Sequence, residues 1–274
     1  MLLICCKVTT NLSEINVYRQ LTRATLFHTV SCATTQEAII PLLMSLKGET
    51  NKIVALFTDN QMFGKGQRGN TWNSTPNDSL ALTIAFPITQ PLESDWVVTN
   101  KAIAVQICNT VNSYLNQDLQ LKWPNDLFLL DKKLGGLLME IQQDQGCRWL
   151  LVGIGINVAR VPQEHSGTAI SMMDCADQEM NKEEVACTIV ESLDGFLRND
   201  LWLADGMDKI EEDYNQRLWK LHQHIEVKFY EGERVVREKM MRLIGVDKLG
   251  RVLIEGDSGK IGAFHHGQVR IVAN

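Results

Sequence analysis

Apolar residues in this sequence occur in short runs, and this feature constrains the fold more than any other. The longest strictly apolar run is Met1–Cys6, which has six residues. A helix that crosses a bilayer needs about 20 apolar residues in succession, and the run also lacks the charged start and the length of a secretory signal. Strand-length segments such as 52–58 and 79–86 instead alternate with helical and turn-forming stretches. This pattern predicts a globular α+β fold.

The size and charge of the chain exclude several classes of protein. It has 274 residues, of which 45% are hydrophobic and 22% are charged, as in ordinary globular proteins. At about 150 residues per domain, this length predicts one large domain or two unequal ones. The net charge is −6, from 27 basic and 33 acidic residues, which is unlike the overall basic surface of a nucleic-acid-binding protein. We therefore expect neither DNA nor a membrane as a partner, and we expect local positive groups to bind any anionic ligand.

Cysteines and histidines give no sign of a disulfide framework or a metal centre. The seven cysteines are an odd, scattered set without a CxxC pair, which indicates reduced thiols in a cytoplasmic protein. The pair His265 and His266 has no cysteine or carboxylate at ligand spacing, so we interpret both as loop residues and assign no metal ligand. The cysteines are Cys5, Cys6, Cys32, Cys108, Cys147, Cys175 and Cys187.

Hydrophobic periodicity predicts strands and helices along most of the chain. A Thr start and apolar spacing predict a helix over 34–47, with Pro41 as an awkward residue inside it. Ser94 as an N-cap and a long apolar stripe predict a helix over 94–115. The polar stretch 59–78 contains glycines and a proline, and we predict a long loop there. Further strands are predicted at 52–58, 79–86, 119–123, 127–130, 133–141 and 149–158, and further helices at 182–198 and 204–221.

The composition becomes β-rich after His222, which suggests a second, smaller unit. We predict a small β-barrel appended to the larger α+β domain, with a linker near 218–223. The chain is therefore divided into an N-terminal extension at 1–26, a main domain at 27–221 and a terminal β-domain at 222–274. The predicted strands of the terminal domain are 225–230, 235–246, 251–254 and 269–272.

The predicted loop carries the segment Gly64–Gly69 (GKGQRG), which matches the dinucleotide-binding pattern GxGxxG. That pattern holds a pyrophosphate only where a helix begins inside the motif. Here residues 70–78 (NTWNSTPND) cannot begin an apolar-periodic helix, so a Rossmann fold is excluded. The chain also contains neither a Walker A sequence nor the His-Arg-Asp and Asp-Phe-Gly motifs of kinases. The segment therefore predicts a long loop with Lys65 and Arg68 among glycines whose amides can approach an anion.

Two further features point to a ligand site. Residues 122–126 (KWPND) place Lys122 at a strand end before a proline turn, where its charge can act on a phosphate or a developing oxyanion. The predicted strand 133–141 contains a diglycine, and the next strand contains GIGIN at 153–157. We expect the missing side chains to let a ligand approach the backbone.

Together these motifs resemble those of the biotin protein ligases. That family combines a GRGRRGRxW loop, a KWPND turn, a KLxGIL strand and a GxGxN strand in this order. Each motif alone is weak, but four in the same order and at similar spacing make the resemblance specific. The present chain has GKGQRGNTW at 64–72, KWPND at 122–126, KLGGLL at 133–138 and GIGIN at 153–157.

The resemblance implies a mixed β-sheet with flanking helices, similar to class II aminoacyl-tRNA synthetases and biotin synthetases, followed by a small SH3-like β-barrel. It extends from about Phe27 to the C-terminus, where 245–247 and 266–269 are similar to the family's terminal barrel. Residues 27–221 would then be the catalytic domain that binds biotin and ATP, and 222–274 the SH3-like domain. A single-function ligase without a DNA-binding domain is expected, because about 26 residues before Phe27 are too few to fold unaided.

The resemblance also assigns roles to individual residues. Lys122 matches the lysine that bridges the biotin carboxylate and the α-phosphate, and is the expected catalytic residue. Thr34 keeps one residue of a Ser-Thr-Asn contact with the ureido ring of biotin, and Asn157 matches a residue near the nucleotide. The expected biotin-binding residues are Ala33, Thr34, Thr35, Gln61, Gly64, Lys65, Gly66, Gln67, Lys122, Gly135, Gly136, Gly153 and Gly155, and the expected residues for ATP and adenylate are Lys65, Gln67, Arg68, Trp72, Asn125 and Asn157.

The implied reaction has two steps. The biotin carboxylate attacks the α-phosphorus of ATP, which releases pyrophosphate and forms biotinyl-5′-AMP. A lysine amine of a biotin carboxyl carrier protein, such as the carrier of acetyl-CoA carboxylase, then takes the biotinyl group and releases AMP. Mg²⁺ is the expected cofactor, because it neutralises the phosphates. The family contains monomers and homodimers, so a homodimer stays open.

The chain departs from the family in its loop. Lys65 and Gln67 stand where the family usually has arginines, and Asn70 replaces a third. An arginine fork binds phosphate through two hydrogen bonds at once, and one charge-assisted bond contributes about 1.5–3 kcal/mol. We therefore expect weaker binding of the adenylate, unless the neighbouring Arg68 compensates.

Three other functions are alternatives to a biotin ligase. A lipoate or octanoate protein ligase shares the fold, but the KWPND turn and the GIGIN strand favour biotin. A biotin-responsive repressor would need a DNA-binding domain ahead of Phe27. A biotin-adenylate binding protein with weak transfer activity is supported only by the altered loop. The chain is not expected to be the biotin acceptor, because Glu238 precedes Lys239 where acceptors have Met.

Overall fold

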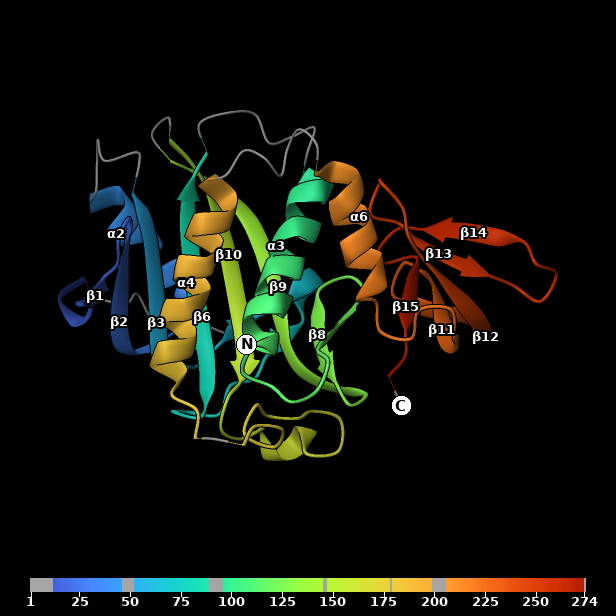
Figure 1. Ribbon diagram of the computed structural model, residues 1–274, viewed down its shortest axis with the longest axis horizontal. Helices are drawn as coiled ribbons and strands as arrows, with labels where there is room; N and C mark the ends of the chain where they lie inside the picture. The colour runs from blue at the N-terminus through green and yellow to red at the C-terminus, as the bar shows by residue number, and fades with distance from the viewer. Residues whose placement is uncertain are drawn as a thin grey trace, which may run out of the picture.

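The computed structural model describes residues 12–45, 52–88, 96–144, 147–177, 179–198 and 206–273. These residues form a large mixed sheet covered by helices and a smaller C-terminal sheet beside it (Figure 1). The predicted α+β fold, with a mixed sheet, flanking helices and a β-rich C-terminal region, is therefore confirmed. Within the described ranges, no helix is both long enough and apolar enough to cross a membrane.

The larger sheet has eight strands, and its central strand β10 pairs along nearly its whole length with β6 on one side and β9 on the other. Strands β2 and β3 are parallel, and their crossover contains α1 and α2. The remaining pairs of this sheet are antiparallel. In pairing order the strands are β1 (Asn16–Gln20), β2 (Ala24–Cys32), β3 (Ile53–Gln61), β6 (Ser79–Pro87), β10 (Cys147–Asn157), β9 (Lys132–Asp144), β8 (Asp126–Leu129) and β7 (Gln120–Lys122).

Side chains of the central strands alternate between two apolar cores, as the period of a strand requires. In β3, Ala55 and Phe57 face one core, and Val54 and Leu56 face the other. Helices α3, α4 and α6 cover the first face, in front of the sheet in Figure 1, whereas α1 and α2 pack on the second. The helices are α1 (Thr35–Ala38), α2 (Ile40–Ser45), α3 (Trp96–Asn112), α4 (Lys182–Arg198) and α6 (Met207–Gln216), with 3-10 turns η1 (Leu12–Glu14), η2 (Gln67–Gly69) and η3 (Gln163–His165).

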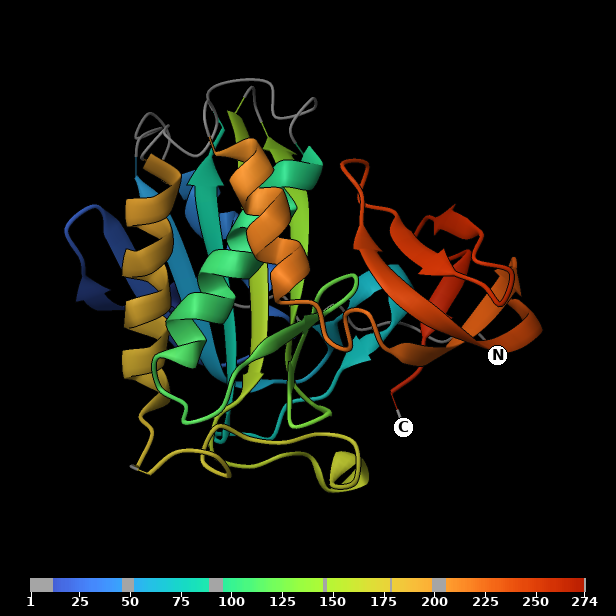
Figure 2. The same cartoon turned by 45° about the vertical axis from the view of Figure 1, so that its right-hand side comes forward.

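The C-terminal sheet is antiparallel and has five strands in the order β14-β13-β12-β11-β15. Figure 2 shows it beside α6. The buried side chains of its strands, among them Val227, Leu243 and Ile254, continue the same core as the larger sheet. Its strands are β11 (His224–Glu231), β12 (Arg234–Val246), β13 (Val252–Glu255), β14 (Ile261–Phe264) and β15 (Val269–Ile271).

Two predicted elements are wrong in part. The helix predicted over 34–47 is divided, because α1 ends at Ala38 and α2 begins at Ile40. This division places Pro41 in a first helical turn, where its missing N–H costs little. The loop predicted over 59–78 is shorter, since β3 continues to Gln61, and it contains a small hairpin of β4 (Gly64–Lys65) and β5 (Thr71–Trp72).

Other differences concern strands that were not predicted and the end of one predicted helix. Strands β1, β2 and β14 have no predicted counterpart, and β2 crosses the proposed boundary after residue 26. The helix predicted over 204–221 ends at Gln216, because the chain then pairs with β7: the N–H of Trp219 donates to the carbonyl of Leu121 at 2.9 Å. The run Met1–Cys6 and the expected N-cap Ser94 lie outside the described residues.

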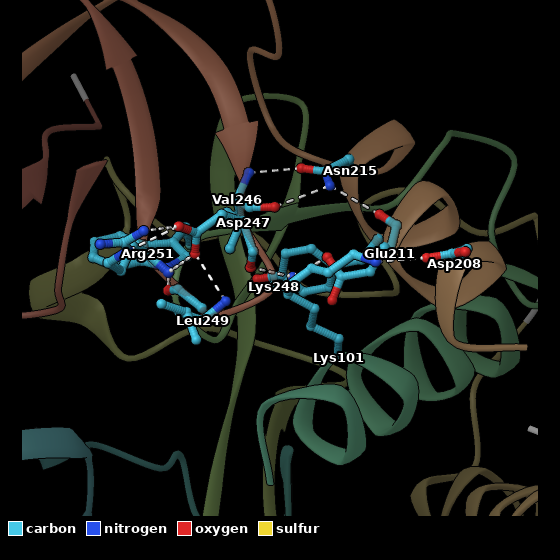
Figure 3. A network of polar contacts seen from close by, with 12 residues as sticks. Lys101, Asp208, Glu211, Asn215, Val246, Asp247, Lys248, Leu249 and Arg251 are labelled. Atoms are coloured by element: carbon cyan, nitrogen blue, oxygen red, sulfur yellow. Dashed lines mark hydrogen bonds and ion pairs between the residues drawn. The ribbon is translucent and has the colours of Figure 1, made fainter. Parts of the chain in front are cut away.

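A buried polar joint connects the two sheets (Figure 3). Lys101 of α3 is 4% exposed and donates to Glu211 of α6 at 2.5 Å and to the carbonyl oxygen of Asp247 at 2.8 Å. Asn215 of α6 accepts the N–H of Val246 at 2.7 Å and donates to the carbonyl oxygen of the same residue at 3.1 Å. These five residues therefore fix the turn between β12 and β13 against two helices of the larger domain.

We predict that Lys101→Ala strongly destabilises the protein. The carboxylate of Glu211, 12% exposed, would stay buried without its counter-charge, a change that costs about 3–5 kcal/mol of the free energy of unfolding. Urea unfolding measures the effect. The control is Lys209→Ala, which removes an exposed lysine from α6, the helix that carries Glu211. It should change the free energy of unfolding by less than about 0.5 kcal/mol. Equal unfolding midpoints for the two variants would contradict the prediction.

Candidate active site

A cavity of about 930 Å³ lies between the larger sheet and the C-terminal sheet. Strands β9 and β10, helix α1, the β4–β5 hairpin, the 122–126 turn and two C-terminal segments contribute to its wall. All four sequence motifs meet there, although they are spread over residues 64–157 of the chain. The expected site residues in the wall are Thr34, Thr35, Gln61, Lys65, Gly66, Gln67, Arg68, Trp72, Lys122, Asn125, Gly136, Gly153, Gly155 and Asn157.

Three other expected residues, Ala33, Gly64 and Gly135, are described by the structure but do not line this cavity. Gly135 lies against β10, where a Cβ would come within 2.5 Å of the carbonyl oxygen of Gly155. Gly64 lies against the side chain of Gln61, and the carbonyl of Ala33 accepts the N–H of Phe63 at 2.8 Å. These residues shape the wall from behind.

Lys122 ends β7 and is 9% exposed. Its Nζ lies 5.2 Å from the centre of the Phe128 ring. Burial lowers the pKa of Lys122 from 10.5, an effect that Asp126 opposes and that the positive charges of Lys133 and Arg270 reinforce. A buried cation in a cavity wall attracts an anionic ligand more strongly than an exposed one, because water screens it less.

The polar residues of the KWPND turn also hold the turn itself. Asp126 forms an ion pair of 2.6 Å with Lys133 of β9. The side-chain amide of Asn125 donates to the carbonyl of Leu137, and the N–H of Leu137 donates back to the carbonyl of Asn125 at 2.9 Å. These contacts join the turn to the KLGGLL strand and so determine where Lys122 lies.

One end of the cavity is formed by α1 and β3. The Oε1 atom of Gln61 accepts the N–H of Thr35 at 2.9 Å and its hydroxyl at 3.3 Å. Thr83 donates to the hydroxyl of Thr35 at 2.8 Å. Gln36 donates to the carbonyl of Leu138 at 3.0 Å and packs against Gly153, where a Cβ would come within 3.0 Å of it. This end therefore combines hydroxyl and amide groups that protein contacts already orient.

Another part of the cavity wall contains Trp72 and Asn157. The indole of Trp72 lies on Gly155, where a Cβ would come within 2.5 Å of the ring. Asn157 is 2% exposed and donates to the carbonyl of Ile170 at 3.2 Å. We expected the glycines of β10 to let a ligand approach the backbone. Gly153 and Gly155 instead make room for the side chains of Gln36 and Trp72, and these side chains line the cavity.

Three wall residues keep buried polar atoms that are not satisfied by the described part of the chain. They are Oε1 of Gln67, Nε1 of Trp72 and Oδ1 of Asn157. Since buried polar groups are nearly always hydrogen-bonded to protein or to water, these atoms are available to bond a polar ligand in this part of the cavity.

The β4–β5 hairpin covers the cavity with the glycine-rich segment. The N–H of Gly66 donates to the carbonyl of Asn70 at 2.7 Å, and Arg68 (φ 54°) and Gly69 (φ 76°) make the turn. Lys65 forms an ion pair of 2.6 Å with Glu37 of α1. Both side chains are about half exposed, so the pair contributes little stability.

Sequence reasoning missed two parts of the wall. One is the loop after β10, which supplies Pro162, His165 and Thr168. The other is the C-terminal sheet and its loops, which supply wall residues from two segments, 230–233 and 266–271. The HGQV segment is the available signal. The sequence predicts His266 only as a loop residue that binds no metal, whereas its ring packs edge-to-face on Trp123 at 5.6 Å and lies in the wall. The C-terminal wall residues are Tyr230, Gly232, Glu233, His266, Gly267, Val269, Arg270 and Ile271.

Residues 31–157 match the model of the Biotin/lipoate A/B protein ligase family. This segment is a domain of that family. The ligase-family domain contains the four motifs, α1, the β4–β5 hairpin and the KWPND turn, so it holds most of the cavity wall.

Several curated proteins that are similar to this chain have names that include the word ligase. It is 24% identical over 186 residues to a Mycobacterium tuberculosis protein named Biotin--[acetyl-CoA-carboxylase] ligase, covering 67% of each chain. It is 25% identical over 232 residues to the Escherichia coli Bifunctional ligase/repressor BirA, covering 80% of this chain and 69% of that protein.

Solved structures of biotin protein ligases have the same fold. The Aquifex aeolicus enzyme in complex with biotin and ATP aligns with a TM-score of 0.70 at 20% identity, over 91% of this chain and 99% of that one. The Leishmania major enzyme in complex with biotinyl-5-AMP aligns with a TM-score of 0.59 at 20% identity, over 90% and 100% of the two chains. At this identity the likeness shows the fold, and the fold is that of the biotin protein ligases.

The lowered pKa of Lys122 predicts how phosphate binding depends on pH. A bound anion stabilises the charged lysine and raises its pKa again. The affinity for ATP should therefore be constant below the pKa of free Lys122 and should fall as the pH rises through it. Titration calorimetry at a series of rising pH values, up to the ordinary lysine pKa of about 10.4, measures this fall. Lys122→Arg, which stays charged in this range, should remove it; an equal fall in that variant would assign the effect to another group.

Proposed function

We propose that this chain is an ATP-dependent ligase that activates biotin as biotinyl-5′-AMP and transfers the biotinyl group to a lysine of a biotin carboxyl carrier protein. The observation that carries the proposal is a buried lysine in one cavity with four motifs of the biotin ligases. The wall also offers polar atoms near the glycine-rich hairpin that have no partner among the described residues.

Biotin would bind at the end formed by α1 and β3. Its ureido ring needs hydrogen-bond donors and acceptors, and Thr34, Thr35 and Gln61 supply hydroxyl and amide groups there. The apolar part of its ring system needs an apolar surface, which Leu82 and Ile154 provide. The biotin carboxylate would then point toward Lys122.

The adenosine moiety would bind beside Trp72 and Asn157. The indole of Trp72 is held on Gly155, and Oδ1 of Asn157 is a buried acceptor without a partner among the described residues. An exocyclic amine of a purine is a donor that would satisfy such an acceptor. Gln67 would lie over the phosphate region as part of the hairpin, where its side-chain N–H groups can donate to phosphate oxygens.

Lys122 would accelerate the first step by bringing two anions together. The biotin carboxylate attacks the α-phosphorus, the bond to pyrophosphate breaks, and negative charge develops on the leaving oxygen. A cation that is already in place between the two reactants reduces their repulsion without reorganisation. The hairpin would exclude water, which otherwise hydrolyses the mixed anhydride.

Mg²⁺ is proposed as the ion that accompanies ATP. The described residues contain no group of three or more His, Cys, Asp or Glu side chains able to hold a metal ion. Nucleotide enzymes commonly bind Mg²⁺ through substrate phosphates and one or two carboxylates. Asp126 and Glu233 bring carboxylates to the wall. When bound, the ion would neutralise phosphate charge.

The second step needs only an incoming amine. The amine nitrogen of the carrier lysine attacks the acyl carbon of biotinyl-5′-AMP, loses a proton and releases AMP. The cavity wall is shared between two sheets, which suits the entry of a lysine side chain from a separate protein. A cytoplasmic location is proposed with this function, because the carrier is part of central metabolism and the described cysteines are free thiols.

Exchange of labelled pyrophosphate into ATP tests the function directly. We expect exchange that depends on biotin and not on lipoate or octanoate. Exchange with lipoate alone would support the lipoate ligase alternative. Binding of biotinyl-AMP without any exchange would support a binding protein.

Lys122→Ala should abolish formation of the adenylate while the fold is kept. The lysine acts mainly on charge that develops in the transition state, so its loss lowers the rate rather than only the affinity. Pyrophosphate release at saturating biotin and ATP measures the step. A rate within about threefold of the wild type, under ~1 kcal/mol in the barrier, would contradict the role.

Gln67→Arg should slow the release of biotinyl-5′-AMP several-fold. An arginine restores a fork that can hold the phosphate bidentately, which glutamine cannot. The dissociation rate of labelled biotinyl-5′-AMP, chased with unlabelled compound, measures the effect. The matched control is Gln67→Lys, which adds the charge without the fork and should slow release less. Equal release from wild type and Gln67→Arg would mean that backbone amides already hold the phosphate.

A further inference from the structure

The wall of the cavity carries more positive than negative charge. Of the described residues that line it, five are lysines or arginines and two, Asp126 and Glu233, are carboxylates. The cations influence one another: burial lowers the pKa of Lys122 and, although Asp126 opposes this, the positive charges of Lys133 and Arg270 lower it further. Such a wall attracts anions such as biotin and ATP. The five cations are Lys65, Arg68, Lys122, Lys133 and Arg270.

The same charge opposes the entry of the second substrate. A lysine side chain has an ordinary pKa of about 10.4 and therefore arrives as an ammonium ion at neutral pH. Biotinyl-5′-AMP adds a single negative charge, so cations still outnumber anions when it is bound, even if Glu37, the partner of Lys65, is counted. Like charges repel, so a carboxylate on the entry path would favour the arrival of the ammonium ion.

Glu233 is the wall carboxylate that is available for such a contact. Asp126 forms an ion pair of 2.6 Å with Lys133, whereas no lysine, arginine or histidine of the described chain forms an ion pair with Glu233. Glu233 is also exposed, although it lines the cavity. A residue with both properties lies where the cavity opens to solvent, and there an incoming side chain first meets the wall.

The turn that carries Glu233 is well supported. Gly232 and Glu233 form the two-residue connection between β11 and β12, and Gly232 has φ 61°, which glycine adopts without strain. Next to the turn, the N–H of Tyr230 donates to the carbonyl of Gln268 at 2.9 Å. This bond holds the turn beside the segment 266–271, which also lines the cavity.

We propose that Glu233 is a binding site for the ammonium group of the acceptor lysine at the entrance of the cavity. The inference rests on the proposed function, and it concerns only the second step. Glu233 raises the local concentration of the ammonium ion beside the bound adenylate. It exchanges no proton with the lysine, and Asp126 is left as the wall carboxylate that accompanies Mg²⁺.

The transfer that follows balances without a further reactant. The ammonium ion loses one proton to water, and the lone pair of the amine nitrogen forms the bond to the acyl carbon. The bond between that carbon and the phosphate oxygen breaks, AMP keeps its electron pair, and the nitrogen loses a second proton to water. Because the nitrogen becomes positive again as the new bond forms, the Glu233 carboxylate favours the attack as well as the entry.

Single-turnover transfer from enzyme that holds biotinyl-5′-AMP tests the site. Two acceptors are compared at neutral pH: Nα-acetyl-lysine amide, which is cationic, and hydroxylamine, which is uncharged. Glu233→Gln should lower the second-order rate constant with the lysine acceptor by about two- to fivefold, the effect of one solvent-screened charge pair. The rate constant with hydroxylamine should stay as in the wild type, which a merely structural role of Glu233 would not produce.

Two variants are matched controls. Glu231→Gln removes the same charge from an exposed residue of the same hairpin that does not line the cavity, and should leave both rate constants unchanged. Glu233→Asp keeps the charge and should keep most of the rate with the lysine acceptor. Added salt should slow this transfer in the wild type, because it screens an exposed charge, and the slowing should disappear in Glu233→Gln. Equal rates for wild type and Glu233→Gln with the lysine acceptor, or equal falls with both acceptors, would overturn the proposal.

Pyrophosphate exchange separates this site from metal binding and from the proposed function. Glu233→Gln should exchange pyrophosphate as the wild type does. A fall in exchange that added Mg²⁺ restores would assign Glu233 to the metal and overturn the lysine site. Absence of exchange in the wild type would contradict the proposed function, and the lysine site would fall with it. Normal exchange in both proteins, together with equal transfer to the lysine acceptor, would contradict the lysine site alone.

Discussion

Backbone pairing of β10 with β6 and β9 is the interaction on which the rest of the site depends. Because β10 is hydrogen-bonded on both sides, its side chains can project only to the two faces of the sheet. Gly153 and Gly155 leave one face open at two points, and Gln36 and Trp72 occupy the space. The same pairing extends through β9 and β8 to β7, and so carries Lys122 to the cavity. A shift of one residue in this register would turn these groups to the opposite face.

The second dependence is on the C-terminal sheet, which is connected to the larger domain by polar rather than purely apolar contacts. Lys101 and Glu211 are almost completely buried, and burial lowers the pKa of Lys101 while the carboxylate of Glu211 opposes the shift. Such a pair adds little net stability but tolerates few alternative arrangements. It therefore holds one orientation of the sheet, in which His266 and Arg270 reach the cavity wall.

The predicted elements agree best with the structure where apolar periodicity is strong and tertiary contacts reinforce it. The strand predicted at 79–86 and the helix predicted at 182–198 are present as β6 and α4. Strand β1 was not predicted, since all five of its residues are exposed and give no alternation. The hairpin inside the predicted loop was missed for another reason: two-residue strands have no periodicity to detect, and their pairing depends on a turn at Arg68 and Gly69.

The sequence by itself determined which chemical groups the motifs bring and in what order. They are a basic glycine-rich segment, a lysine before a proline turn, and glycines in two strands, the second of which ends in the amide of Asn157. This is the order of the motifs in the biotin ligases. Short-range properties of the chain, such as run lengths, turn residues and spacing, carry that information. Only the tertiary structure decided that Gly153 and Gly155 accommodate Gln36 and Trp72, and that residues near 266 close the same cavity. Contacts between segments that lie far apart in the chain are set by how the two sheets pack against each other, and no local pattern records that packing.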